Sequence, residues 1–144
     1  MIAWVYQLTD RLRNLGRRRF WPAGLASGRQ AEDLAHRFLR ASGVVIVARN
    51  YHPPFGGADL DLVGWDGASL AIVEVKSRSS SDVEPPERAV DANKQRLLER
   101  SARDYARRAG LDWACVRFDI VSVIFSRPLR IEWFADAFPP RRTL

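Results

Sequence analysis

The sequence predicts an α/β domain, with one β-sheet and helices packed on it, in the order helix, three strands, helix, strand, with a further strand near the C-terminus. Three observations support this. Segments 28–42 and 87–108 have apolar residues at the three- and four-residue spacing of a helix. Segments 57–63 and 70–76 alternate charged and aliphatic residues with the period of a strand. Between these strands lies the Asp-Gly dipeptide typical of a hairpin turn.

The elements before the hairpin follow from local pattern. Helix 28–42 has an apolar stripe, and Gly43 is placed to end it. The aliphatic run 44–48 then predicts a buried strand. Segment 50–57 is rich in proline and glycine and predicts a loop that leads into the hairpin.

After the hairpin, the segment 77–86 is polar and interrupted by proline, which predicts a loop before the second helix. Segment 113–125 predicts a strand and 129–134 a further one. The single cysteine, Cys115, lies in this apolar stretch, so we expect a buried thiol. One cysteine permits no intrachain disulfide, which suits a reducing cytoplasm.

The hairpin brings acidic residues together. If the turn has two residues, so that Trp65 pairs with Ala68, Asp59 lies opposite Glu74; if it has four, so that Trp65 pairs with Leu70, Asp61 does. Either register puts Asp59, Asp61, Glu74 and Lys76 on one face of the sheet. Like charges that face each other destabilise a sheet, so this pattern indicates a bound cation. Carboxylates with open positions suit Mg²⁺ or Mn²⁺, which also bind phosphates.

Lys76 would stand beside such a metal ion. There it would stabilise the charge that develops on a phosphate, or position or deprotonate the attacking water. The alternative is an ordinary cross-strand ion pair between exposed side chains, which contributes little to stability. Glu32, at the edge of the stripe of the first helix, is placed to point toward the acidic strand face. Its alternative is a solvated first-turn glutamate favoured by the helix dipole.

The chain resembles a known family at several motifs in the same order. These are Gly28-Arg29-Gln30-Ala31-Glu32-Asp33-Leu34-Ala35, Ala41-Ser42-Gly43, Arg49-Asn50, Ala58-Asp59-Leu60-Asp61-Leu62-Val63, Val73-Glu74-Val75-Lys76-Ser77-Arg78, Ala89-Val90-Asp91-Ala92-Asn93-Lys94-Gln95-Arg96 and Arg117-Phe118-Asp119-Ile120-Val121. They resemble the YraN-type proteins, small bacterial proteins assigned to the restriction-endonuclease-like (PD-(D/E)xK) superfamily and predicted to be nucleases. The resemblance covers residues 28–123 and implies a restriction-endonuclease-like core, a central mixed β-sheet flanked by helices.

The resemblance also implies roles for individual residues. Asp61 matches the invariant acid of the central strand, and Glu74 and Lys76 match the acid-x-lysine motif that follows it. Glu32 matches the helix glutamate of junction-resolvase-like members. A catalytic set of Asp61, Glu74, Lys76 and Glu32 is therefore implied, with Mg²⁺ or Mn²⁺ as cofactor.

Further ligands and contacts are implied around that set. The metal ligands would be Asp61, Glu74, the Val75 carbonyl and Asp59, although Asp59 stands where the family usually has glutamate. Lys94, Gln95 and Arg78 are implied as nucleic-acid contacts. For the Lys94-Gln95 pair, a solvated position on a helix is the alternative.

Composition agrees with an enzyme that acts on nucleic acid. The chain has 144 residues, enough for one domain, and 23 Lys and Arg against 17 Asp and Glu give a net charge of +6. Such a surface binds a phosphate backbone in a salt-dependent way. We expect a basic amphipathic N-terminal extension (1–24), a single nuclease-like domain (25–136) and a basic C-terminal tail (137–144).

No stretch of the sequence has the length and apolarity to span a bilayer, so we expect a cytoplasmic protein without a membrane span. The N-terminal extension would pack on the domain, on a second copy in a homodimer, or at a membrane surface. Two functional hypotheses remain. One is a metal-dependent nuclease acting on DNA rather than RNA, of a structure-specific, Holliday-junction-resolvase-like kind. The other is a non-catalytic nucleic-acid-binding module that retains the nuclease fold.

Overall fold

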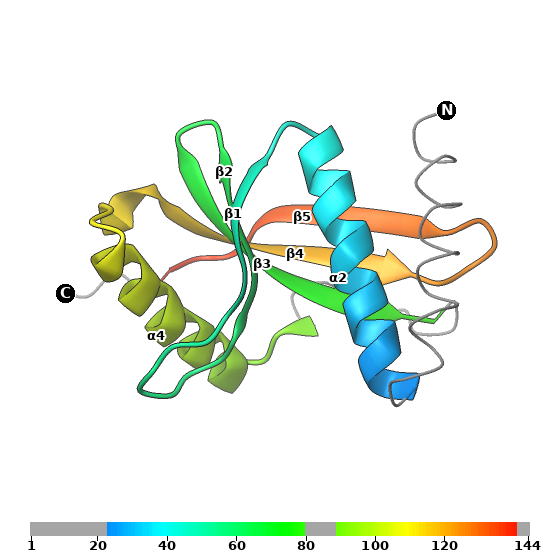
Figure 1. The fold of residues 1–144 in the computed structure, drawn as a ribbon, viewed down its shortest axis with the longest axis horizontal. Helices are drawn as coiled ribbons and strands as arrows, with labels where there is room; N and C mark the ends of the chain where they lie inside the picture. The colour runs from blue at the N-terminus through cyan, green and yellow to red at the C-terminus, as the bar shows by residue number, and fades with distance from the viewer. Residues whose placement is uncertain (1–22, 80–88, 141–144) are drawn as a thin grey trace.

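The domain is built on a five-stranded sheet with a helix on each face (Figure 1). The structure, a computed structural model, describes residues 23–79 and 89–140. Its elements are helix α2 (Ala23–Ala41), strands β1 (Val45–Tyr51), β2 (Leu60–Asp66) and β3 (Ser69–Arg78), helix α4 (Ala92–Arg108), the short 3-10 helix η1 (Trp113–Cys115), and strands β4 (Val116–Ile124) and β5 (Arg130–Phe138).

The sheet is mixed, as expected. Its strand order is β1-β2-β3-β4-β5, and only the pairing of β3 with β4 is parallel. The α/β prediction and the order of its elements are confirmed, and the further C-terminal strand is β5. Because parallel neighbours need a crossover connection, α4 lies between β3 and β4 in the chain and packs back on the sheet.

Two apolar layers hold the helices to the sheet. On one face, Leu98 and Ala102 of α4 pack with Leu70 and Ile72 of β3. On the other, α2 residues pack with Ala71 and Val73; these α2 residues are Ala31, Leu34, Ala35 and Leu39. Consecutive residues of β3 thus enter opposite layers, and β3 is covered on both sides, as its apolar run requires.

The hairpin adopts the register in which Asp61 lies across from Glu74. Trp65 pairs with Leu70, and Asp66 pairs with Ser69 around a tight turn in which Gly67 has φ 59°. This φ is easily adopted by glycine but rarely by other residues. The alternative register, with Asp59 across from Glu74, is not the one observed.

The first strand differs from expectation, because the run at 44–48 predicts a buried strand. β1 is instead an edge strand, and Val45 and Val47 are 61% and 47% exposed. Strand β4 also begins later than predicted, since residues 113–115 form η1. Cys115 lies in that turn, half-buried, and its thiol donates to the Asp112 carbonyl at 2.9 Å, so the expectation of a buried strand thiol is wrong.

The ends of the chain are only partly described. Most of the predicted N-terminal extension and its amphipathic pattern lie outside the described residues, as do 80–88 and 141–144. The segment assigned to the C-terminal tail begins inside β5, whose last residue, Phe138, is buried and stacked on Phe118. Each helix in the described part of the chain is too short or too polar to cross a membrane.

Candidate functional site

Asp61 lies near the start of β2, where β2 and β3 separate. The ladder between the two strands ends at the pair Leu62 and Val73. Beyond it, the Val75 N–H donates to Asp61 Oδ2 at 2.8 Å. Since a residue in an antiparallel strand turns its N–H and C=O toward the same neighbour, the Val75 carbonyl also faces the Asp61 side.

Glu74 is a buried carboxylate on β3, only 6% exposed. Its Oε1 lies 3.5 Å from Lys76 Nζ and 3.7 Å from Lys94 Nζ, so a lysine on the same strand and one on α4 approach the same oxygen. Its Oε2 is buried and accepts no hydrogen bond from an N–H or hydroxyl group of the residues that the structure describes. The predicted group of Asp61, Glu74 and Lys76 is therefore brought together, and Lys94 joins it.

These two lysines are the only ones in the chain; every other cationic side chain among the 23 Lys and Arg is an arginine. Lysine is a compact point charge that shifts its pKa readily, whereas the arginine guanidinium stays charged and binds in a planar fork. A chain that uses arginine everywhere else has lysine only beside Glu74. Both lysines of the chain therefore lie at the same buried carboxylate.

Glu32 approaches the group from α2, on the opposite layer of the sheet. Its pKa is raised, chiefly by burial and then by the negative charge of Asp61, which lies close enough to act on it. A side-chain hydrogen bond from Asn50 and the charge of Arg49 oppose this shift. Within the described part of the chain, Glu32 Oε2 is buried without a hydrogen-bond partner and is ion-paired with Arg49 at 3.8 Å. The interpretation of Glu32 as a solvated surface glutamate is therefore wrong.

Two carboxylate oxygens of the site lack a hydrogen-bond donor among the described residues. Buried carboxylate oxygens are almost always hydrogen-bonded, yet Glu32 Oε2 and Glu74 Oε2 are not, and of these two Glu32 Oε2 has a cation, Arg49, at 3.8 Å. No three carboxylate, imidazole or thiolate side chains of the described residues converge into a ready-made chelate. Two carboxylates, Asp61 and Glu74, and a backbone carbonyl fit an ion that keeps several of its waters, as Mg²⁺ does.

Burial of Asp61 beside Glu74 alters its protonation. Desolvation, and after it the negative charge of Glu74, raise the pKa of Asp61 to about 7. The hydrogen bond from Val75 and the charge of Lys94 act in the opposite direction but do not offset burial. Without a bound cation, the Asp61 carboxyl therefore changes between its protonated and ionised forms near neutral pH.

This raised pKa makes a prediction about stability. A carboxyl group that holds its proton more tightly when folded stabilises the protein fully below its unfolded pKa, and the effect is lost as the pH rises through the folded value. In EDTA, Asp61→Asn should therefore gain stability relative to wild type as the pH rises from about 4 to about 7, between the unfolded and folded pKa values of Asp61. We expect its melting temperature to exceed that of wild type by about 4 °C at the upper end, the shift that 1 kcal/mol produces in a domain of this size.

Thermal unfolding followed by circular dichroism at several pH values measures this difference. Glu132→Gln, which removes a carboxylate of β5 that is paired with Arg130 outside the site, is the matched control and should show no difference that grows with pH. If the Asp61→Asn difference is also constant with pH, Asp61 does not exchange its proton in this range.

Asp59 is not brought into the site. It lies in the loop before β2, its side chain is 58% exposed, and its Oδ1 is 2.8 Å from His52 Nδ1. The alternation that predicts Asp59 on the face of Asp61 assumes a regular strand, but β2 begins only at Leu60.

The implied nucleic-acid contacts have different surroundings. Lys94 is in the first turn of α4, where Asp91 caps the helix by accepting from the Lys94 N–H at 2.8 Å. Gln95 uses its amide to donate to the Val90 carbonyl at 2.9 Å, which anchors the helix start. Arg78 is the last residue of β3. Lys94 also reaches Glu74, with its Nζ 3.7 Å from Glu74 Oε1.

Sequence reasoning gave no role to the groups that support Glu32. Arg49 of β1 donates to the buried Asp33 at 2.9 Å, and its other terminal nitrogen lies 3.4 Å from His36. The next residue, Asn50, has φ 49°, a left-handed conformation that asparagine tolerates better than most residues, and its side chain reaches Glu32. The sequence indicated these groups only through Arg49-Asn50, one of the motifs that carry the family resemblance.

Comparison with known proteins connects these residues to a family. Residues 31–123 match the model of the uncharacterised protein family UPF0102. The chain is 54% identical over 138 residues to a UPF0102 protein of Solibacter usitatus, covering 96% of this chain and all of that relative. It is 44% identical over 107 residues to one of Koribacter versatilis, covering 74% of each chain. A UPF0102 protein of Porphyromonas gingivalis is 42% identical over 115 residues, or 78% of this chain and 83% of its own.

Proposed function

This chain belongs to the UPF0102 family, and from that premise we propose that it is a metal-dependent nuclease that hydrolyses phosphodiester bonds in DNA. We assign it to the YraN-type proteins of the restriction-endonuclease-like superfamily. One observation supports this most strongly. The half-buried Asp61 and the buried Glu74 lie together at the point where β2 and β3 separate, and the only two lysines of the chain stand beside Glu74. One buried oxygen of Glu74 accepts no hydrogen bond from an N–H or hydroxyl group of the described residues.

Asp61, Glu74 and the Val75 carbonyl would hold the ion in this proposal. When bound, Mg²⁺ or Mn²⁺ polarises the phosphoryl oxygen and lowers the pKa of a coordinated water. The Val75 N–H fixes the orientation of Asp61 through its 2.8 Å hydrogen bond. Glu74 is held from the other side by two ammonium groups, so neither carboxylate has to reorganise before it binds.

The remaining residues would act on the substrate. Lys76 places a positive charge beside Glu74, where it stabilises the charge that develops on the scissile phosphate. Lys94, at the start of α4, contacts a neighbouring phosphate oxygen. Glu32, whose pKa is raised by burial, accepts a hydrogen bond or a proton from the attacking water on the side of Asp61. Basic side chains elsewhere supply most of the attraction to the DNA backbone.

A second candidate function is a DNA-binding module without turnover. The observation that favours it is the pair of lysines near Glu74 Oε1, since two ammonium groups neutralise a carboxylate without any metal ion. The unpartnered Oε2 and the raised pKa of Asp61 favour the enzyme, because that neutralisation is incomplete.

A single assay separates the two functions. Purified protein is incubated with Mn²⁺, Mg²⁺ or EDTA and a panel of labelled DNA structures, namely blunt duplex, single strand, flap and four-way junction. We expect wild type to cut at least one structure with metal and none in EDTA, and Asp61→Ala to cut none. Metal-independent cutting, or equal cutting by Asp61→Ala, would reject the proposed site. Binding without any cutting by wild type would favour the module.

A further inference from the structure

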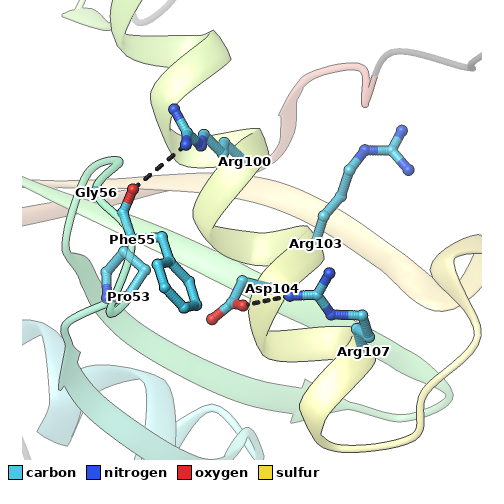
Figure 2. Close-up of a pocket in the computed structure, with 7 residues that line it drawn as sticks. All are labelled: Pro53, Phe55, Gly56, Arg100, Arg103, Asp104 and Arg107. Atoms are coloured by element: carbon cyan, nitrogen blue, oxygen red, sulfur yellow. Dashed lines mark hydrogen bonds and ion pairs between the residues drawn. The ribbon is translucent and has the colours of Figure 1, made fainter.

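The loop before β2 and the C-terminal half of α4 enclose a pocket of about 390 Å³ that the proposed mechanism does not use (Figure 2). Its lining joins one aromatic ring to three arginines and one carboxylate; these residues are Phe55, Arg100, Arg103, Arg107 and Asp104, with Pro53 and Gly56 completing the wall. Phe55 is the most exposed large apolar side chain of the described residues, at 77%. An aromatic surface next to cations is typical of sites that bind unpaired nucleotides.

The loop that bears Phe55 is held in place by α4. Arg100 donates to the Phe55 carbonyl at 3.3 Å, as Figure 2 shows, and the Ala58 N–H donates to the Leu97 carbonyl at 3.4 Å. Gly57 has φ 118°, and a Cβ there would lie 2.5 Å from Ser101 Oγ, so only glycine allows this close approach. Because the loop is anchored to α4 at the Phe55 carbonyl and again at Ala58, the position of Phe55 relative to α4 is fixed.

The charges of the pocket are also fixed. Asp104 accepts hydrogen bonds from the Tyr51 hydroxyl at 2.6 Å, from Arg107 at 2.8 Å and from Arg108 at 3.0 Å, and the first of these is the chief cause of its lowered pKa. Arg103 lies 4.1 Å above the ring of Trp113. Each guanidinium has five N–H donors, so these internal contacts orient the arginines and still leave donors for a ligand.

The pocket and the candidate active site lie along one helix. Lys94, which approaches Glu74, is in the first turn of α4, and Arg103 is about 14 Å further along its axis. Nine residues are about 2.5 helical turns, so Arg103 faces the other side of α4 from Lys94. A strand whose scissile phosphate is at Lys76 and Lys94 must therefore cross α4, over a distance that a few nucleotides span, to reach the pocket.

We infer that this pocket binds an unpaired nucleotide of single-stranded DNA that adjoins the cleavage site, with its base stacked on Phe55 and its phosphate on Arg100 and Arg107. The inference rests on the proposed nuclease function and specifies its substrate. Stacking on Phe55 requires a base that is not inside a duplex. DNA with a single-stranded flap or overhang is therefore the preferred substrate, ahead of blunt duplex.

Fluorescence anisotropy in EDTA tests the pocket without cleavage, using a labelled single-stranded oligothymidylate and a blunt duplex of equal length. Phe55→Ala should bind the single strand about tenfold more weakly, since one base stack is lost, and the duplex within about twofold of wild type. Phe55→Tyr should restore binding. Val47→Ala, which trims another exposed apolar side chain, is the matched control and should bind both ligands as wild type does.

Arginine variants test the phosphate contact separately. Arg107→Ala should lower the slope of log affinity against log salt for the single strand by about 0.7, the value for one lost phosphate contact. Arg130→Ala removes another exposed, ion-paired arginine outside the pocket and should leave the slope unchanged. Equal slopes for the two variants would overturn the phosphate assignment.

The pocket and the nuclease proposal can fail independently. If Phe55→Ala binds the single strand as tightly as wild type, or wild type does not bind it, the pocket assignment is overturned, whatever the cleavage assay shows. If Phe55→Ala loses single-strand binding while wild type cuts no DNA with any metal, the pocket is supported and the nuclease proposal fails. Phe55 and Arg107 are both exposed, and melting curves check that Phe55→Ala and Arg107→Ala fold.

Discussion

Glu74→Gln is expected to lower the rate of Mn²⁺-dependent DNA cleavage by about a thousandfold or more. Glutamine has nearly the same size but replaces one of the two carboxylates in this buried site with a neutral amide. A metal ion contributes several kcal/mol to the stabilisation of a transition state, and about 4 kcal/mol corresponds to a thousandfold in rate. Quantitative single-turnover cleavage of the best structure in the DNA panel measures the effect.

Asp59→Asn is the matched control for that variant, since it also replaces a carboxylate with an amide. Asp59 lies two residues from Asp61 in the chain but is exposed and paired with His52, so cleavage should stay within a few-fold of wild type. A ligand that binds only the folded protein stabilises it, so Mn²⁺ should raise the melting temperature of wild type and Asp59→Asn more than that of Glu74→Gln. If Asp59→Asn loses activity as severely as Glu74→Gln, the site is assigned to the wrong acids.

The hairpin shows what strand alternation can and cannot predict. The alternating pattern and the Asp-Gly turn placed both strands, but they left two registers open. Those registers differ by two residues, and a shift of two keeps every side chain on its own face, so the apolar pattern favours neither. In the observed register Leu62 pairs with Val73, and both pack under α2. The choice depends on turn geometry and on packing against an element distant in the sequence.

Strand β1 illustrates a limit set by sheet order. An aliphatic run predicts a strand covered on both faces, but whether it is central or at an edge depends on which strands pair. β1 pairs only with β2 among the described strands, so Val45 and Val47 remain exposed. No local feature of 44–48 contains that information.

For the candidate site, sequence reasoning placed the residues on regular strands and failed at the strand end. Asp61 and Glu74 come together because both are fixed by the hairpin. Asp59 does not, because the chain there is already a loop. The burial of Glu32 depends on Arg49 and Asn50 of β1, a contact between elements that no periodicity specifies.

The position of Lys94 was suggested only by resemblance, whereas the structure places it 3.7 Å from Glu74. The amino-acid composition pointed to this lysine, whereas the spacing of apolar and polar residues did not. With only two lysines among 23 Lys and Arg, the lysine positions were already unusual in the sequence. The pocket at Phe55 had no such indication, because its lining joins a loop to a helix about 50 residues later, and only the folded chain shows that they meet.

Lys76→Met is expected to reduce metal-dependent cleavage by about a hundredfold while DNA binding and folding remain near wild type. Loss of one preorganised contact to the transition state commonly has an effect of this size. Binding should change little, since Lys76 is one of 23 Lys and Arg. An exposed ion pair, by contrast, contributes only about 0 to 1 kcal/mol, and its loss would leave cleavage nearly unchanged. Cleavage rates with saturating Mn²⁺, together with anisotropy binding in EDTA, separate these outcomes.

Lys94→Met is the control that isolates the role of Lys76, because both ammonium groups approach the same Glu74 oxygen, at 3.5 and 3.7 Å. If the lysines only neutralise Glu74, the two variants should lose activity equally. If Lys76 acts on the scissile phosphate, Lys76→Met should lower the cleavage rate much more than Lys94→Met does. Lys76→Arg should recover only part of the rate, because a planar guanidinium cannot occupy the position of a compact ammonium. Cleavage by Lys76→Met at the wild-type rate would remove Lys76 from the mechanism and leave the metal ion and Glu32 to act alone.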